Sequence, residues 1–329
     1  MFDIISIGDA MQDFFIDLQE ASVLTSKGEM KLNLCVSFAD KVPAKSIDAQ
    51  VAGNAANVAV GSSRLGLKTA LYSVIGDDGA GTAIKEKMQA EKVSTKYLIT
   101  DKGKKNNYSF VLNHKNERTI IIYHEPRKYR MPKLEHSEWI YLTSLGNTSQ
   151  RNKSFLDLHR DVIKHVKRHR VKLAFNPGTY QIRMHPKLLG DVIATSEVVF
   201  MNVEEARYIL GAKKDAVIKS LLYKLFQRGP KKVVITDGPN GSYAYSGDAY
   251  YKIGIFPSPL LERTGAGDSF ATAFVAALFY NKDTADALCW GTINSASVVT
   301  KIGPMAGLLT ESTILRTLKK HPKFVSEKF

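Results

Sequence analysis

The sequence is poor in cysteine, and none of its hydrophobic runs is long. Its 329 residues include two cysteines, Cys35 and Cys289, which lie far apart and belong to no Cys-x-x-Cys pair. They predict reduced thiols and not a disulfide framework. The longest apolar stretch, 271–280, is far shorter than the ~20 residues of a membrane-spanning helix. The first residues also lack the pattern of a secretory signal. We therefore expect a cytoplasmic protein without a membrane partner.

Sequence motifs of several common enzyme classes are missing as well. The chain contains no G-x-x-x-x-G-K-[ST] phosphate loop, and Phe270 stands where the last glycine of a G-x-G-x-x-G dinucleotide motif would be. It has neither a G-x-S-x-G nor an H-E-x-x-H motif, and its histidines do not have metal-ligand spacing. These absences argue against hydrolase and zinc-enzyme functions.

Acidic residues are too few to balance the basic ones. Lys and Arg number 46 against 32 Asp and Glu, which gives a net charge of +14, and such a charge attracts polyanions. The most basic run is 160–172. Within and just before it, Phe155, Leu158, Val162 and Val166 fall on one helical stripe, so the basic residues are expected on the solvated face of that helix. A nucleic-acid partner is not favoured.

Strand-like and helix-like segments alternate through most of the chain. This order favours a single α/β domain over 1–329, with a doubly wound, mainly parallel sheet covered by helices on both faces. The predicted strands are 4–7, 68–75, 139–143, 171–175, 198–201 and 232–236, and the predicted helices include 55–65 and 271–280.

Two segments interrupt this alternation, at about 14–51 and 103–124. The second contains the β-rich runs 108–112 and 119–123 around Lys115, Asn116, Glu117 and Arg118. Each segment is too small to bury a core by itself, so we expect the two to pair as one small sheet. Such a sheet could cover an active site as a lid.

The most informative segment is the small-residue turn Gly265-Ala266-Gly267-Asp268, which leads into an apolar helix. Amide groups at a helix N-terminus converge on one point and favour an anion there. A carboxylate beside such a site could accept a proton from a hydroxyl that attacks phosphorus, which makes Asp268 a candidate general base. Alternatively, Asp268 only caps the helix.

This turn, followed by Ser269 and Phe270, resembles a signature of the ribokinase-like (PfkB) carbohydrate kinases. The segment 52–59, the sequence Arg64-Leu65-Gly66 and the turn 76–79 resemble the first signature of the same family, in the same order. The resemblance covers nearly the whole chain. It implies a phosphotransferase that uses ATP and Mg²⁺ and acts on a small substrate with a hydroxyl group.

The resemblance also implies roles for other residues. Asp13, Gly53, Asn54 and Asn57 would bind the substrate, although Asp13 alone could be a solvated turn residue and Asn57 a polar residue on an outer helix face. Glu205 would organise the water shell of Mg²⁺. The residues implied in nucleotide binding are Asn202, Thr236, Gly238, Gly241 and Asn294. Asn202 and Glu205 could also form only a helix capping box.

The sequence departs from the family pattern near the base. Glu262 stands where many relatives carry an Asp of a monovalent-cation site, and Arg263 replaces a small residue, so activation by potassium is left open. Ala52 replaces a glycine of the substrate signature, and its methyl group could narrow the choice of substrate.

The leading expectation is a kinase of the ribokinase, fructokinase or ketodeoxygluconate kinase type. The first alternative is a nucleoside kinase, in which Phe14 and Phe15 stack on a base or simply pack in the lid. The second is an inactive kinase fold that binds a partner. Two lids could also pair in a homodimer.

Overall fold

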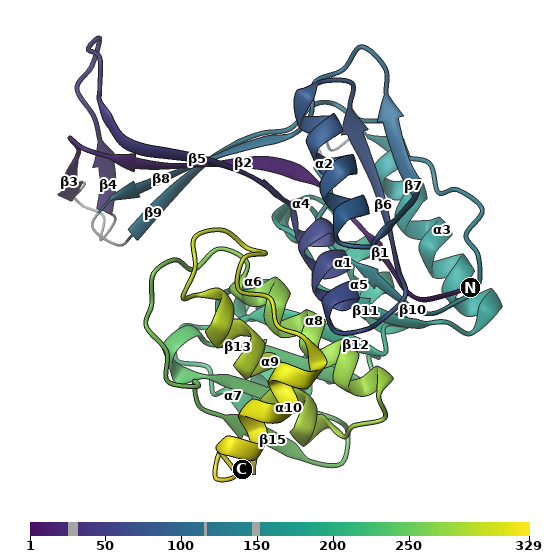
Figure 1. Cartoon of the computed structure of the whole chain (residues 1–329). Helices are drawn as coiled ribbons and strands as arrows, with labels where there is room; N and C mark the ends of the chain where they lie inside the picture. Colours follow the sequence, from purple (N-terminus) through teal and green to yellow (C-terminus); the bar gives the residue numbers. More distant parts are fainter. Residues whose placement is uncertain (26–31, 115–116, 147–151) are drawn as a thin grey trace.

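The structure is a computed structural model that describes residues 1–25, 32–114, 117–146 and 152–329. In these residues, ten strands form one central sheet (Figure 1). In sheet order, the strands are β16 (Glu327–Lys328), β15 (Tyr250–Ile253), β14 (Ser242–Tyr245), β13 (Lys232–Thr236), β12 (Val198–Asn202), β11 (Lys172–Phe175), β10 (Ser137–Leu142), β1 (Phe2–Ile7), β6 (Thr69–Gly76) and β7 (Ser94–Asp101). The strands from β13 to β7 are parallel, and β14 to β16 add an antiparallel edge.

Helices cover both faces of this sheet. One face packs against α3 (Lys153–His169), α5 (Pro186–Thr195), α6 (Val203–Leu210) and α7 (Ile218–Phe226). The other packs against α1 (Asn54–Arg64), α2 (Gly79–Ala90), α8 (Ala266–Phe279), α9 (Thr284–Val298) and α10 (Glu311–Lys320). In β1, Ile5 and Ile7 contact the first layer and Ile4 the second, as the two-residue period of a strand requires. The predicted doubly wound fold is confirmed.

The basic helix α3 is amphipathic, as its sequence predicts. Phe155, Leu158, Val162 and Val166 are buried against the sheet, whereas Lys167 and Arg168 are exposed. The basic run therefore lies on the solvated side of a peripheral helix.

The helix that follows the glycine turn is the most deeply buried one near the expected site. Residues 268–277 of α8 are all buried, and the helix lies against both α1 and α9. A helix that is apolar all round belongs in the interior. Packing on several sides therefore holds the helix from Asp268 onward, whereas Ala266 is half-buried and Gly267 is exposed.

The two interrupting segments form one small sheet, as predicted. Its strands are β5 (Ala44–Ala52), β2 (Met11–Leu18), β8 (Tyr108–His114) and β9 (Glu117–Tyr123), in that order. A separate ribbon of β3 (Ser22–Thr25) and β4 (Leu32–Cys35) extends from it (Figure 1). The predicted turn residues Lys115 and Asn116 lie outside the described residues.

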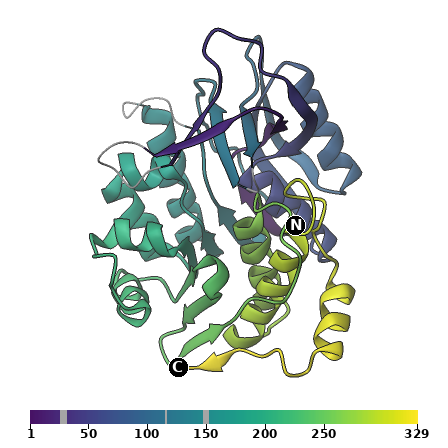
Figure 2. The ribbon, with the colours of Figure 1, turned by 90° about the vertical axis from the view of Figure 1, so that its left-hand side faces the viewer.

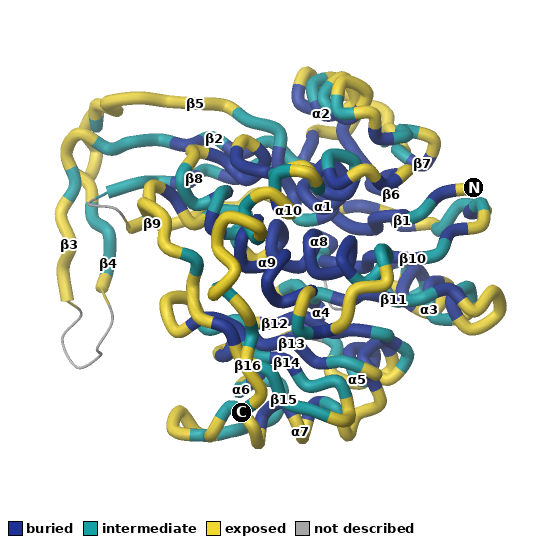
Figure 3. The backbone as a smooth tube through the Cα atoms, turned by 60° about the horizontal axis from the view of Figure 1, so that its bottom comes forward, coloured by how far each residue is buried: buried dark blue, intermediate teal, exposed yellow. Residues whose placement is uncertain are grey.

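This small sheet, the lid, projects from the body of the molecule. Figure 2 shows the lid in the upper part of the molecule and the C-terminus at the bottom. Figure 3 shows that β5 and β3 are largely exposed and that β4 is mostly of intermediate burial, whereas β1, β10 and α8 are buried. The lid is thus attached to the core at its base, where β2 and β5 enter the central fold.

Candidate active site

A cleft of about 1030 Å³ lies between the lid and the carboxyl ends of the central strands. After β1 the chain adds β6 and β7 on one side of this strand and then β10 on the other side, so the strand order reverses next to β1. The cleft includes this point. There the N–H of Asp9, after β1, donates to the carbonyl of Ser144, after β10, at 2.8 Å, and both residues line the cleft. Ligands of open α/β sheets bind at such a reversal.

Most of the residues selected from the sequence meet in this cleft. The lining includes Asp13, Gly53, Asn54, Asn57, Asn202, Glu205, Thr236, Gly238, Gly265, Ala266, Gly267 and Asp268. They come from the lid, α1, α6, the end of β13 and the start of α8. Residues far apart in the chain are therefore brought to one surface.

Asp268 does not cap its helix. The N-cap of α8 is Gly265, which makes no side-chain capping bond and has φ +80°. The Asp268 carboxylate instead accepts a hydrogen bond of 2.7 Å from Asn57 Nδ2, and the residue is only 7% exposed. A side chain added at Gly265 would lie 2.5 Å from Pro304 Cβ, so this position requires glycine.

The start of α8 offers free amide groups to the cleft. In the described part of the chain, no backbone hydrogen bond takes up the N–H groups of Gly267 and Asp268, whereas Ala266 donates to the carbonyl of Arg263 at 3.3 Å. At Gly267 an added Cβ would meet open space. Two amides and the helix dipole therefore face a space that suits an anion.

Asp13 provides a second buried carboxylate. It lies in β2, is 5% exposed, and its Oδ1 has no hydrogen-bond partner among the described residues. The Oδ1 atom of Asn57 is buried and unpartnered in the same way. Buried polar atoms are normally hydrogen-bonded, so these two atoms fit the polar groups of a ligand in the cleft.

Burial changes the acidity of both carboxylates. Desolvation raises the pKa of Asp268 to about 7; the hydrogen bond from Asn57 opposes this shift, and the charge of Asp13 adds to it. Desolvation likewise raises the pKa of Asp13 to about 7, opposed by a hydrogen bond from Ser109. A pKa near the working pH suits a general base.

The proposed nucleotide side of the cleft contains a helix cap. Asn202 Oδ1 accepts from the Glu205 amide at 2.8 Å, and Glu205 Oε2 accepts from the Asn202 amide at 2.9 Å. The capping box considered from the sequence is therefore present. Both residues also line the cleft, and burial raises the pKa of Glu205.

Some residues selected from the sequence do not reach the cleft lining. Asn294 is fully buried. Its side-chain Nδ2 donates to the carbonyl of Ser269, and its Oδ1 accepts from the N–H of Leu309. Gly241 lines no part of the cleft; it has φ +90°, and a Cβ there would lie 2.0 Å from the Ile253 carbonyl. Their assignment to the nucleotide site stays a prediction; in the structure, both residues hold neighbouring backbone segments.

The aromatic residues considered for base stacking are also elsewhere. Phe14 stacks on Phe110 with ring centroids 5.3 Å apart, and Phe15 is 3% exposed within the lid. Neither lines the cleft. They pack the lid, which was the other possibility.

Sequence reasoning missed several lining residues. Asp9 directly follows β1, and this position could have drawn attention to it. His124, Tyr180 and Arg183 reach the cleft from separate segments, and no motif indicated them. Burial lowers the pKa of His124, so this side chain is neutral at pH 7.

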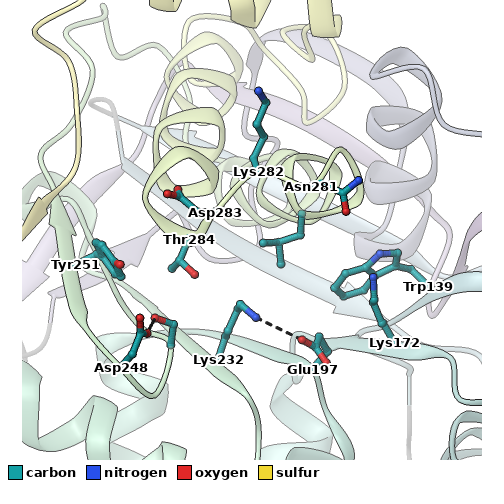
Figure 4. A pocket seen from close by; sticks show the side chains of 12 residues that line it. Trp139, Lys172, Glu197, Lys232, Asp248, Tyr251, Asn281, Lys282, Asp283 and Thr284 are labelled. Carbon is teal, nitrogen blue, oxygen red and sulfur yellow. Dashed lines mark hydrogen bonds and ion pairs between the residues drawn. The ribbon is translucent and has the colours of Figure 1, made fainter.

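A second, smaller pocket lies at the amino ends of the strands. It measures about 480 Å³ and is lined by Trp139, Lys172, Glu197 and Lys232 among others. Figure 4 shows that Lys232 points toward Glu197, with which it pairs at 3.3 Å. None of the residues selected from the sequence lines this pocket, so the cleft under the lid is the candidate active site.

Comparison with known proteins gives the family of this chain. An anion-binding helix N-terminus beside a buried carboxylate, at the carboxyl ends of a parallel sheet, is typical of enzymes that transfer phosphoryl groups. Residues 1–311 match the sequence model described as "pfkB family carbohydrate kinase". The chain belongs to this family and is a carbohydrate kinase.

Three similar proteins illustrate the range of the family. A 5-dehydro-2-deoxygluconokinase of Bacillus licheniformis is 29% identical over 264 residues, which are 76% of this chain and 81% of that protein. The nucleoside kinase of Methanocaldococcus jannaschii has a TM-score of 0.78 at 19% identity, covering 97% of this chain and 98% of that one. Arabidopsis thaliana ribokinase, solved with ribose and ATP, has a TM-score of 0.77 at 18% identity, covering 97% and 99%. The two structures share the fold.

The raised pKa values predict a pH dependence. If ionised Asp268 is needed for turnover, kcat/KM should fall about tenfold per pH unit below about pH 7, because the protonated acid accepts no proton. Asp13→Asn removes a neighbouring negative charge and should therefore shift this acidic limb to lower pH. The pH–rate profiles of the wild type and of Asp13→Asn check this prediction. An acidic limb at the same pH in both would contradict the effect of the Asp13 charge on the pKa of Asp268.

Proposed function

We propose that this carbohydrate kinase transfers the γ-phosphoryl group of ATP to a primary hydroxyl of a small sugar, with Asp268 as general base. The main support is the buried Asp268 carboxylate beside the free amides of Gly267 and Asp268. The hydroxyl proton passes to the carboxylate as the hydroxyl oxygen bonds to phosphorus and the bond to ADP breaks. The amides stabilise the negative charge of the transferring group.

The substrate is held by the polar atoms that lack partners. Asp13 Oδ1 and Asn57 Oδ1 accept hydrogen bonds from sugar hydroxyls. Asn57 also donates to Asp268, so one side chain orients both the base and the sugar. The lid strands β2, β8 and β9 contribute Asp13, Ser109 and Ile120 to the cleft, and they exclude water from the reacting groups.

The residues present fit ATP with Mg²⁺. In the described residues there is no group of three or more His, Cys, Asp or Glu that could hold a metal ion directly. The cleft offers Glu205 beside Asn202, Thr236 and Gly238. This donor set suits an ion that arrives with phosphate and keeps several of its waters; when bound, Mg²⁺ neutralises charge on the phosphate oxygens. Glu205 would order those waters.

We infer that the sugar is a sugar acid. The matched curated relatives include 5-dehydro-2-deoxygluconokinases, and Arg183 and Arg263 line the cleft. Arg183 is exposed and makes no ion pair within the described residues, so its charge is available to a carboxylate. A nucleoside is less favoured, because Phe14 and Phe15 lie outside the cleft.

ATP consumption with a substrate panel tests this function. The panel contains 5-dehydro-2-deoxygluconate, 2-keto-3-deoxygluconate, ribose, fructose, adenosine, inosine and guanosine, and heparin retention serves as the control for polyanion binding. We expect turnover with the acids to exceed that with the neutral sugars and nucleosides. Turnover with nucleosides alone would establish the nucleoside kinase, and no turnover with any compound would favour an inactive binding protein.

Asp268→Asn should separate catalysis from stability. Asn keeps the size of the side chain and an oxygen for Asn57 but cannot accept the hydroxyl proton, so kcat should fall by about 10² to 10⁴. The melting temperature should stay close to that of the wild type. Turnover and a thermal melt of one purified variant measure both, and near-normal kcat would remove Asp268 from catalysis.

Glu205→Gln should alter the metal requirement. Gln still accepts from the Asn202 amide and keeps the capping box, but it removes a negative charge from the outer shell of Mg²⁺. The Mg²⁺ concentration for half-maximal rate should rise about 10-fold to 100-fold. Glu204→Gln, on the same turn of α6, is the control. An equal response of the two variants would contradict the assignment.

We also propose that two copies pair through the outer face of the lid. By the strand register, Phe14, Phe110 and Ile121 lie side by side on that face, and Ile47 and Ile121 are 65% and 56% exposed. An apolar face of this kind is complementary to itself across a two-fold axis. Light scattering should give twice the 36.5 kDa of one chain.

A charge on the outer face should break this dimer. Ile121→Glu is expected to yield the monomer mass with little change in melting temperature, because Ile121 is exposed. Val217→Glu, at an equally exposed residue before α7, is the matched control and should leave the mass unchanged. A monomeric wild-type protein would overturn the proposal.

A further inference from the structure

The tip of the lid carries a charged pair that faces an opposite pair on the body. Arg118 of β9 contacts Glu262, with 3.0 Å between Nη1 and Oε1. The preceding residue, Glu117, faces Arg263, with 3.9 Å between Oε1 and Nη1. An acid–base sequence on the lid therefore meets an acid–base sequence on the body, and each residue pairs with the opposite charge. We call these four residues the clasp.

On the body side, the clasp contacts the residue before the turn 265–268, which we call the phosphate turn. Glu262 Oε1 accepts not only from Arg118 but also from the Thr264 amide at 2.8 Å and from Thr264 Oγ1 at 2.6 Å. Thr264 directly precedes Gly265, the N-cap of α8. One carboxylate oxygen thus joins the lid to the residue before the anion-binding amides.

The contact between the lid and the body involves a buried carboxylate, that of Glu262. The Glu262 side chain is 6% exposed, whereas Arg118 is 30% exposed. Among the described residues, Arg118 is the one cation paired with this carboxylate. Lifting the lid would separate this carboxylate from its counter-ion. A second lid strand contacts the neighbouring loop, where Gln50 Nε2 donates to the Ile302 carbonyl at 3.2 Å.

We propose that the clasp couples the position of the lid to the shape of the phosphate turn, with Arg118 and Glu262 as positioning residues for phosphoryl transfer. With the lid down, Arg118 fixes the Glu262 carboxylate, and Glu262 fixes Thr264 and the start of α8. With the lid raised, both the water barrier and the support of the turn are lost together. The kinetic part of this proposal rests on the proposed function, whereas the contact itself does not.

The test compares Arg118→Met with Lys45→Met. Both variants remove one lid cation from an ion pair, but the Lys45–Asp17 pair, at 3.5 Å, lies within the lid between β5 and β2. Hydrogen exchange without ligands should be faster over β9 in Arg118→Met and unchanged in Lys45→Met. This measurement needs no substrate, so it tests the clasp even if the sugar panel shows no activity.

Kinetics then test the coupling. With its sugar substrate, Arg118→Met should lose about tenfold in kcat, since small displacements of positioned groups are costly, and should hydrolyse more ATP per sugar phosphorylated because the lid no longer excludes water. Arg118→Lys should restore most of the rate. The double variant Arg118→Met/Glu262→Gln should be no slower than the slower single variant, as expected for two residues acting through one contact.

Three results would overturn the proposal. The first is equal hydrogen exchange over β9 in Arg118→Met and Lys45→Met. The second is faster exchange in Arg118→Met with unchanged kcat and unchanged ATP hydrolysis, which would show that the lid contact does not act on the turn. The third is a double variant whose loss is the product of the two single losses, because the residues would then act independently. A melting curve for each variant separates these results from unfolding.

Discussion

The site depends on a carboxylate held almost without water at the start of a buried helix. Asp268 is buried because α8 packs between α1 and α9, and Asn57, its one side-chain partner among the described residues, comes from α1. Burial alone would favour the neutral acid, and the Asn57 hydrogen bond counteracts this. The packing of two helices therefore sets both the position and the acidity of the proposed base.

The lid covers the cleft, and its charged residues also influence the acidity of Asp268. Asp13 enters the cleft from a lid strand, and its charge adds to the raised pKa of Asp268. Glu262 in turn raises the pKa of Asp13, and Arg118 pairs with Glu262. A path of neighbouring charges thus runs from the lid to the phosphate turn. Because interactions between buried charges are weakly screened, the position of the lid affects the site electrostatically.

Family membership fixes the chemistry more firmly than the substrate. The turn at 265–268 requires a glycine conformation at Gly265 and leaves open space at Gly267, and the phosphoryl transfer that we propose would need both with any acceptor. We propose that selectivity depends instead on groups such as His124 and Arg183, which reach the cleft from elsewhere in the chain. Relatives at 29% identity can share the first set and differ in the second.

The sequence by itself determined the fold class and the pairing of the two lid segments, because periodicity and glycine turns are local signals. Its resemblance to a family also indicated part of the cleft lining. It could not decide whether Asp268 caps its helix, since a cap and a base have the same local pattern; only the tertiary structure makes Gly265 the N-cap and brings the Asp268 carboxylate to Asn57. Nor could it place Asn294 away from the cleft or bring Arg118 to Glu262. Those outcomes depend on how distant segments pack. Local sequence patterns do not contain the distance in space between two side chains that are far apart along the chain.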